Sequence, residues 1–390
     1  MRVSAGSLLA LALSVGVWGA IDVPAQQPGA SPPDGLVRSQ LTVGSRPVTV
    51  AFDPDLRTDA AAHSALLSGN RVAGGARVHI GRLESVPLLR IGTLDGSPPE
   101  APAEDAGPIR AVTYELWLTR DADGWALDAV WVAEDGTVAD RSSGAIALAE
   151  APSTATFETL SASVAPTSGE TGRIELRWGD RAWTADFHFT DPPPPSAAAA
   201  QQAASGQAAQ GDSRPFEDDA RADLAARFTR LAERNETAIA LADGARIAVL
   251  VWQDLGIDHP DYAAIGTLAD GDMMRLTEAA VNRLRTDVPL RFGDVLVPTG
   301  NLSPDFAGSY GIWIQRRGPG WRLVFNNERD SWGTQHNPEF NAAQTELAYS
   351  RTGPTDRPLG AQLVPTSSES GQLVIHWGAH QWAADFVVVR

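Results

Sequence analysis

The sequence of 390 residues contains no cysteine and no lysine. The lack of cysteine excludes a disulfide framework, a thiol nucleophile and Cys-ligated zinc or iron–sulfur sites. The lack of lysine excludes a Schiff-base residue and the Walker-A phosphate loop. The 31 basic residues are therefore all arginines, set against 48 acidic ones, and the formal net charge is −17. Because so acidic a chain repels phosphate backbones, no nucleic-acid partner is expected.

The sequence also has no long apolar run. It has one short apolar run near the N-terminus. Arg2 is followed by the apolar run Leu8–Val17, which is too short to span a bilayer. The small-residue sequence Val23-Pro24-Ala25 then resembles a cleavage site. This pattern predicts a signal peptide over residues 1–25 and export to the periplasm or the extracellular space. No membrane span is expected in the mature chain, because no later run is long and apolar enough.

The composition of the remaining chain predicts two domains. Strand patterns such as Val48–Phe52 alternate with a period of two and are rich in β-branched residues. A Pro/Ala/Gln-rich segment over residues 191–213 interrupts these patterns and is typical of a linker. Residues 36–190 are therefore predicted to form a first β domain, and residues 214–390 a second. The second opens with one amphipathic helix over 215–234, which has acidic residues in its first turn and arginines in its last.

One stretch of the chain occurs twice. Gly172–Phe187 and Gly371–Phe386 align without a gap at an offset of 199 (371 − 172), and Gly, Trp, Gly, Trp, Ala, Asp and Phe coincide. Shorter matches such as Gly124-Trp125 and Gly320-Trp321 precede these stretches in the same order. Such order predicts a tandem duplication. The expected fold class is therefore mainly β, with two tandem sandwich-like or barrel-like domains, the first of which is a degenerate copy.

Each copy of this stretch predicts a β-hairpin. A glycine at the first central position suits a type II′ turn, and the resulting register places Ile375 opposite Trp382 and Gln372 opposite Asp385. The aromatic residues then share one face of the hairpin, because side chains alternate along a strand. The residues predicted to build the two hairpins are Trp178, Gly179, Trp183, Asp186, Trp377, Gly378, Trp382 and Asp385.

Two histidines in the second copy have the four-residue spacing of a helical zinc site. On the hairpin, however, His376 and His380 point to opposite faces, and the first copy has Arg177 and Arg181 at these places. No metal site is therefore expected. His376 is predicted to face solvent, and His380 is predicted to lie over Trp377.

The second copy also contains a series of blocks that is similar to a known family. The blocks are Arg285–Asp294, Ala307–Trp313, Gly320–Leu323, Phe325–Asn327, Trp332–Gln335 and His376–Gly378. Their order resembles the domain-of-unknown-function family twenty-nine-eleven of exported bacterial proteins, over about residues 240–390. Residues 43–189 resemble that family only weakly and lack the Asn-Asn and Trp-Gly-Thr-Gln blocks. The resemblance implies the domain type and export, and it implies no activity.

Residues found only in the second copy are the candidates for ligand binding. They are Asn326, Asn327, Trp332, Gln335 and His336, for which turn formation and core packing are the alternative roles. The sequence thus predicts a non-catalytic binding or interaction module of the cell envelope, whose partner is a glycan, a peptide or a protein. No cofactor is expected. A purely structural pair of domains is not separated from this hypothesis by the sequence.

The alternative function is a carboxylate-dependent hydrolase that acts on a glycan or another envelope polymer. Its candidate carboxylates are Asp258, Asp261 and Asp305, with His259 or His336 as the acid or base. The sequence alone does not bring these residues together, and it contains no Gly-x-Ser-x-Gly nucleophile motif. No residue is therefore assigned a catalytic role.

Overall fold

The structure is a computed structural model of the chain. The described residues are 35–43, 46–68, 76–86, 89–95, 111–120, 124–133, 135–168, 170–190, 235–278, 280–301, 307–328 and 335–390. We call residues 35–190 the first half and residues 235–390 the second half. The predicted signal peptide, linker and amphipathic helix lie outside the described residues, as do Trp332 and Asp305.

The fold is mainly β, as the sequence predicts. The first half contains β1 (Val37–Val43), β2 (Arg46–Phe52), α1 (Ala61–Ser68), β3 (Ala76–Ser85), β4 (Leu89–Ile91), β5 (Leu94–Asp95), β6 (Val112–Arg120), β7 (Trp125–Val132), β8 (Gly144–Pro166) and β9 (Thr171–Phe189). None of its helices or those of the second half, as far as the chain is described, is long and apolar enough to traverse a bilayer.

The second half follows with shorter strands. It contains β10 (Asn235–Ala240), β11 (Arg246–Val251), α4 (Pro260–Ala264), η1 (Ile265–Thr267), β12 (Met273–Met274), β13 (Arg283–Thr286), β14 (Leu290–Phe292), β15 (Val295–Val297), β16 (Gly300–Asn301), β17 (Ala307–Arg317), β18 (Gly320–Asn326), η3 (Pro338–Phe340), β19 (Asn341–Arg351), β20 (Gly360–Pro365), β21 (Ser370–Trp377) and β22 (His380–Val388).

Strand pairing follows the same scheme in the two halves, and all of the ladders are antiparallel. In the first half β1, β2, β3, β6, β7 and β8 pair in that order, and β8 then pairs with β9, which also pairs with β4. In the second half β10, β11, β13, β17, β18 and β19 pair in the corresponding order, followed by β22 and β14. The long strand β8 thus takes the places of both β19 and β20.

The hairpin predicted at the C-terminus has the expected register. Ile375 lies opposite Trp382, and the side-chain amide of Gln372 donates to Asp385 over 2.7 Å. In the first half the corresponding contact is a two-bonded ion pair between Arg173 and Asp186. The glycine at each turn has a left-handed φ, 67° in the first half and 53° in the second, which an L side chain rarely adopts.

Each half has its own hydrophobic core. The first core contains Trp178 and Trp183, and the second contains Trp377 and Trp382; all four are at most 1% exposed. Buried and less buried residues alternate along β9, which places the aromatic residues on its inner face. The tryptophans shared by the two hairpins are therefore core residues.

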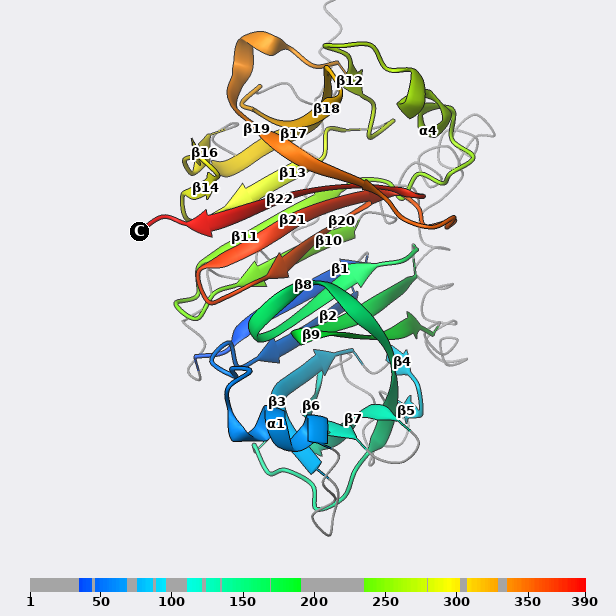
Figure 1. Ribbon diagram of the computed structural model, residues 1–390, viewed down its shortest axis with the longest axis vertical. Helices are drawn as coiled ribbons and strands as arrows, with labels where there is room; N and C mark the ends of the chain where they lie inside the picture. Colours follow the sequence, from blue (N-terminus) through cyan, green and yellow to red (C-terminus); the bar gives the residue numbers. More distant parts are fainter. Residues whose placement is uncertain are drawn as a thin grey trace, which may run out of the picture.

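The two halves meet along corresponding strands (Figure 1), which we call the junction. β1 pairs antiparallel with β10, from Arg38 opposite Ala240 to Val43 opposite Asn235. Beside this ladder, the C-terminal part of β8 packs on β20. Because each strand meets its own counterpart in the opposite direction, the junction has the arrangement of an interface between two-fold related subunits.

Candidate functional site

The Trp-Gly turn of each hairpin is covered by a short helical segment that sequence patterns do not predict. His63 of α1 lies on Trp178, with ring centroids 4.6 Å apart, and Tyr262 of α4 lies 5.6 Å from Trp377. A Cβ added to Gly378 would lie only 2.4 Å from the Tyr262 hydroxyl. The glycine is therefore needed for close approach as well as for the turn. Burial lowers the pKa of His63, so its ring is neutral at pH 7.

The prediction that His376 faces solvent is wrong. The residue is 2% exposed, and its ring lies against the backbone of Gly360, which also contacts Pro166 of the first half. Among the described residues, neither ring nitrogen finds a hydrogen-bond partner of normal geometry. Burial, and then the charge of Arg357, lower the pKa of His376 well below its usual range, against a weaker opposite effect of the Pro358 backbone. The sequence misses this because the other half contributes to the burial.

The position predicted for His380 is also wrong, because its ring stacks on Trp382 rather than over Trp377. The two ring planes are 9° apart and the centroids are 5.7 Å apart. Nδ1 of His380 is hydrogen-bonded to the hydroxyl of Tyr349 over 2.8 Å. Burial, followed by the charge of Arg351, lowers the pKa of His380 and favours the neutral ring. Tyr349 remains 39% exposed above this stack.

The first half has an ion pair at the corresponding place. Glu150 lies opposite Trp183, as Tyr349 lies opposite Trp382, and Glu150 binds Arg181. The same carboxylate accepts a hydrogen bond of 2.9 Å from the indole of Trp125. A charged pair thus covers the paired tryptophans of the first half, whereas an aromatic pair covers those of the second. We call Tyr349 and His380 the aromatic cap.

The predicted ligand-binding residues lie in and beside the connection between β18 and β19. The amide of Asn326 donates to the backbone of Asn337 over 2.8 Å and to the side chain of Asn341 over 3.0 Å. His336 Nε2 is 2.7 Å from the same Asn341 oxygen. Asn326, which is buried, and the half-buried His336 therefore hold the connection together.

Some of the described residues in this connection are open to solvent. Gln335 is exposed, and the neighbouring Phe340 is 43% exposed. The backbone of Asn327 donates to that of Phe340, whereas the buried side-chain oxygen of Asn327 has no partner among the described residues. The structure brings Asn326, Asn327 and His336 into one connection, and their role in ligand binding stays a prediction.

The candidate hydrolase residues are partly brought together. His259 caps the N-terminus of α4, and its ring nitrogens lie 3.6 Å from Asp261 and 3.1 Å from Glu278. Arg275 lies 3.6 Å from Asp261. Asp258 is exposed in the turn before the helix, and His336 belongs to the β18–β19 connection. Within the described ranges, no group of three or more His, Asp or Glu residues is arranged to hold a metal ion.

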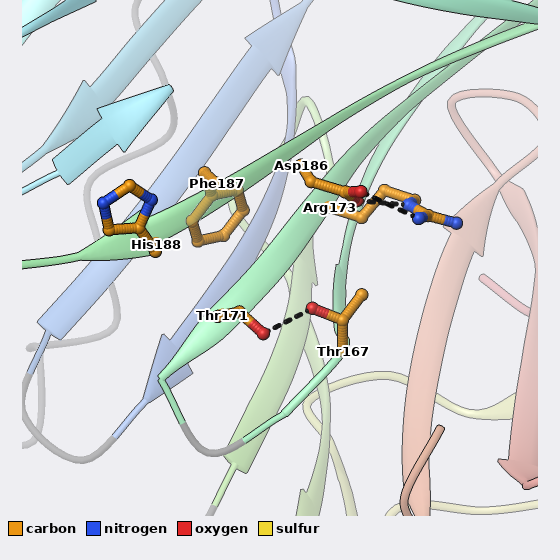
Figure 2. A pocket seen from close by; sticks show the side chains of 6 residues that line it. All are labelled: Thr167, Thr171, Arg173, Asp186, Phe187 and His188. Atoms are coloured by element: carbon orange, nitrogen blue, oxygen red, sulfur yellow. Dashed lines mark hydrogen bonds and ion pairs between the residues drawn. The ribbon is translucent and has the colours of Figure 1, made fainter. Parts of the chain in front are cut away.

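Two shallow hollows lie at corresponding places in the two halves. The first, of about 290 Å³, is shown in Figure 2 and is lined by Thr167, Thr171, Arg173, Asp186, Phe187 and His188. The second, of about 340 Å³, includes Thr366, Ser370, Asp385 and Phe386. In both, the hydroxyls of the adjacent turn bond to each other, as Thr167 and Thr171 do in Figure 2. The hollows therefore follow from a turn that the halves share, and the hydroxyls of that turn are already paired with one another.

Comparison of the chain with protein-family models, curated proteins and solved structures gives no match. The resemblance to family twenty-nine-eleven therefore stays a prediction.

Proposed function

We propose that this protein is an exported, non-catalytic binding module of the cell envelope and that its second half carries the binding surface. The observation that carries this proposal is the unequal exposure of apolar side chains. Of the six large apolar residues exposed in the described part of the chain, five belong to the second half. They are Ile257, Leu296, Phe340, Tyr349 and Val387, against Val138 in the first half.

Among these exposed residues, Tyr349 of the aromatic cap is the one that ring contacts and a side-chain hydrogen bond hold in place. The Tyr349 ring is held by its hydroxyl bond to His380 and by ring contacts with Trp321 and Trp382, 5.9 and 5.8 Å between centroids. A ring fixed in this way loses little side-chain entropy on binding. Tyrosine also combines an apolar face with a polar edge, which suits an amphipathic partner. A neutral glycan is the favoured partner class, since the net charge of −17 disfavours polyanions.

The experiment is a tryptophan-fluorescence and thermal-shift titration of the mature chain with neutral oligosaccharides of β-linked N-acetylglucosamine and of glucose. Because Trp321 and Trp382 lie directly under Tyr349, we expect the bound sugar to change their emission. An apolar peptide serves as the alternative probe. If neither probe changes emission or melting temperature at millimolar concentration, binding at the aromatic cap is refuted.

The matched control exchanges the cap for its first-half counterpart. The double variant Tyr349→Glu/His380→Arg introduces the pair found at Glu150 and Arg181, which the same framework already accommodates. We expect it to remain folded and to lose the response to sugar. In parallel, Gln335→Ala tests the exposed side of the β18–β19 connection without removing a contact inside it. A loss of response in Gln335→Ala alone would move the binding surface to that connection.

We also infer that the two halves descend from one duplicated unit. The inference is supported by contacts that recur at a constant offset of 199, such as Thr167–Thr171 and Thr366–Ser370. The shared pairing scheme and the paired hollows support it as well. Within this proposal the first half keeps the framework and has a charged cap, so the second half is the one that binds.

A further inference from the structure

The junction is built from corresponding contacts on its two sides. The Ser161 hydroxyl donates to the Pro365 carbonyl, and Gly360, which corresponds to Ser161, lies against Pro166, which corresponds to Pro365. Between these contacts, the Gln362 amide donates to the Ser163 hydroxyl over 2.9 Å, and these two residues correspond to each other. The junction is thus nearly symmetric in its backbone, so any difference between its two sides lies in the side chains.

One difference is at the position of Arg177, where the second half has a histidine. Arg177 lies opposite Ser161 in the first half and binds Glu175 over 2.6 Å, with its side chain 25% exposed. The corresponding residue of the second half is His376, opposite Gly360, and Val374 takes the place of the carboxylate. Arg177 therefore has a partner and water for its charge. A charge on the buried His376 would have no carboxylate partner and almost no contact with solvent, and only the Pro358 backbone would favour it weakly.

The charged groups around His376 add to this asymmetry. β20 has no titratable residue, and His376 is the one titratable residue of β21. The preceding loop contributes Arg357, whose guanidinium donates to the Pro166 carbonyl across the junction over 3.2 Å. From β9, Glu175 stabilises the charge of Arg357, Arg173 opposes it, and Asp186 stabilises it weakly. Glu175 is bound by Arg177 and by Gln362, and no carboxylate among the described residues is hydrogen-bonded to the His376 ring.

We propose that the junction opens in mild acid, because protonation of the buried His376 puts a second cation beside Arg357. Separation of β8 from β20 removes Pro166 from Gly360 and lets water reach both cations. The two hydrophobic cores contain no residue in common and each lies within one half, so each half keeps its own core when the junction opens. The proposal is independent of what the second half binds.

The direction of the pH dependence follows from the binding of the proton. In the open form, His376 has the ordinary histidine pKa of about 6.5. In the closed form, its pKa lies well below that value, so the ring takes up a proton only at much lower pH. Above about pH 6.5 the His376 ring is neutral in both forms, so protonation does not oppose the closed form. Below that value the ratio of open to closed molecules rises about tenfold per pH unit, until the closed form is protonated as well.

The experiment is hydrogen–deuterium exchange of the full chain between pH 7.5 and 5.0, corrected for the intrinsic pH dependence of exchange. We expect amides of β1, β10 and β20 to lose protection about tenfold per pH unit below 6.5. Amides of β6–β7 and β17–β18, inside the two halves, report whether the halves remain folded. Small-angle X-ray scattering of the same samples should show a larger radius of gyration as the junction opens.

Two substitutions separate the proposed role from a general weakness of the junction. His376→Phe keeps a buried ring that takes no proton, and it should remove the pH response of β1, β10 and β20. His376→Gln, a smaller neutral residue, should do the same if the phenylalanine variant does not fold. The proposal is overturned if the junction and the two cores lose protection together, or if a folded neutral variant responds to acid as the parent chain does.

Discussion

The two halves share a backbone framework. They differ in the pairs of side chains that lie over the tryptophan pair and at the junction. At the tryptophan pair, a Glu150–Arg181 ion pair in the first half corresponds to a Tyr349–His380 pair in the second. At the junction, the paired Arg177 corresponds to the unpaired and buried His376. The backbone and the core therefore tolerate either a charged or an aromatic pair at one place. The exchangeable positions are those at which function should differ between the halves.

The largest expected effect tests whether the two cores are equivalent. Trp183→Ala and Trp382→Ala each remove a side chain at most 1% exposed, and each should cost about 3–5 kcal/mol of unfolding free energy. Equilibrium denaturation, followed by circular dichroism, measures both. If one substitution costs less than about 1 kcal/mol, the two hairpins do not have the same structural role.

The next effect distinguishes the two turns. Gly179→Ala and Gly378→Ala both put a side chain at a left-handed φ, at a cost of about 1–2 kcal/mol. In the second half the new Cβ also meets the Tyr262 hydroxyl at 2.4 Å, whereas in the first it lies 3.4 Å from His63. We therefore expect Gly378→Ala to cost about 1–3 kcal/mol more than Gly179→Ala in urea denaturation. Equal costs would show that Tyr262 moves aside freely.

A smaller effect concerns the aromatic cap. His380→Arg alone leaves a poorly hydrated cation next to Arg351 and should cost about 2 kcal/mol. Adding Tyr349→Glu should restore at least half of that loss, because it supplies the carboxylate that Arg181 has in the first half. A double-mutant cycle in denaturant gives the coupling energy between the two positions. Additive costs would mean that the two caps are not interchangeable.

The smallest effect concerns the exposed pairs beside the hairpins. Asp186→Ala breaks an ion pair with Arg173 and should cost at most about 1 kcal/mol, with less effect at high salt. Asp385→Ala breaks a hydrogen bond from the neutral Gln372, so the stability that it loses should depend less on salt. Melting temperatures at 0.05 and 1 M salt measure this difference. The same salt dependence for both variants would contradict the distinction between an ion pair in the first half and a neutral hydrogen-bond partner in the second.

The sequence is sufficient to predict the mainly β class and the register of the C-terminal hairpin. That register followed from two local features, the alternation of side chains and the glycine of the turn, and a second copy constrained it independently. The contact between Gln372 and Asp385 could be predicted for the same reason. Local pattern was enough because both partners lie on adjacent strands of one hairpin.

The same reasoning failed where the partner lies far along the chain. His376 is buried through Gly360 and Pro166, and the second of these belongs to the other half. α1 and α4 have eight and five residues, too few for a clear helical period, although Pro260 directly after a capping residue could have indicated α4. The inward contacts of Asn326 and His336 depend on Asn341 and the backbone of Asn337, which no spacing rule identifies as partners.

The antiparallel pairing of β1 with β10 also determines in which direction the molecule can engage a partner. A two-fold turn at the junction points corresponding surfaces of the halves away from each other, and α1 and α4 accordingly lie at opposite ends in Figure 1. The charged cap of the first half and the aromatic cap of the second lie at corresponding places, so the same two-fold turn relates them. A partner that binds the aromatic cap therefore meets one half only, and the corresponding place on the other half presents the ion pair of Glu150 and Arg181.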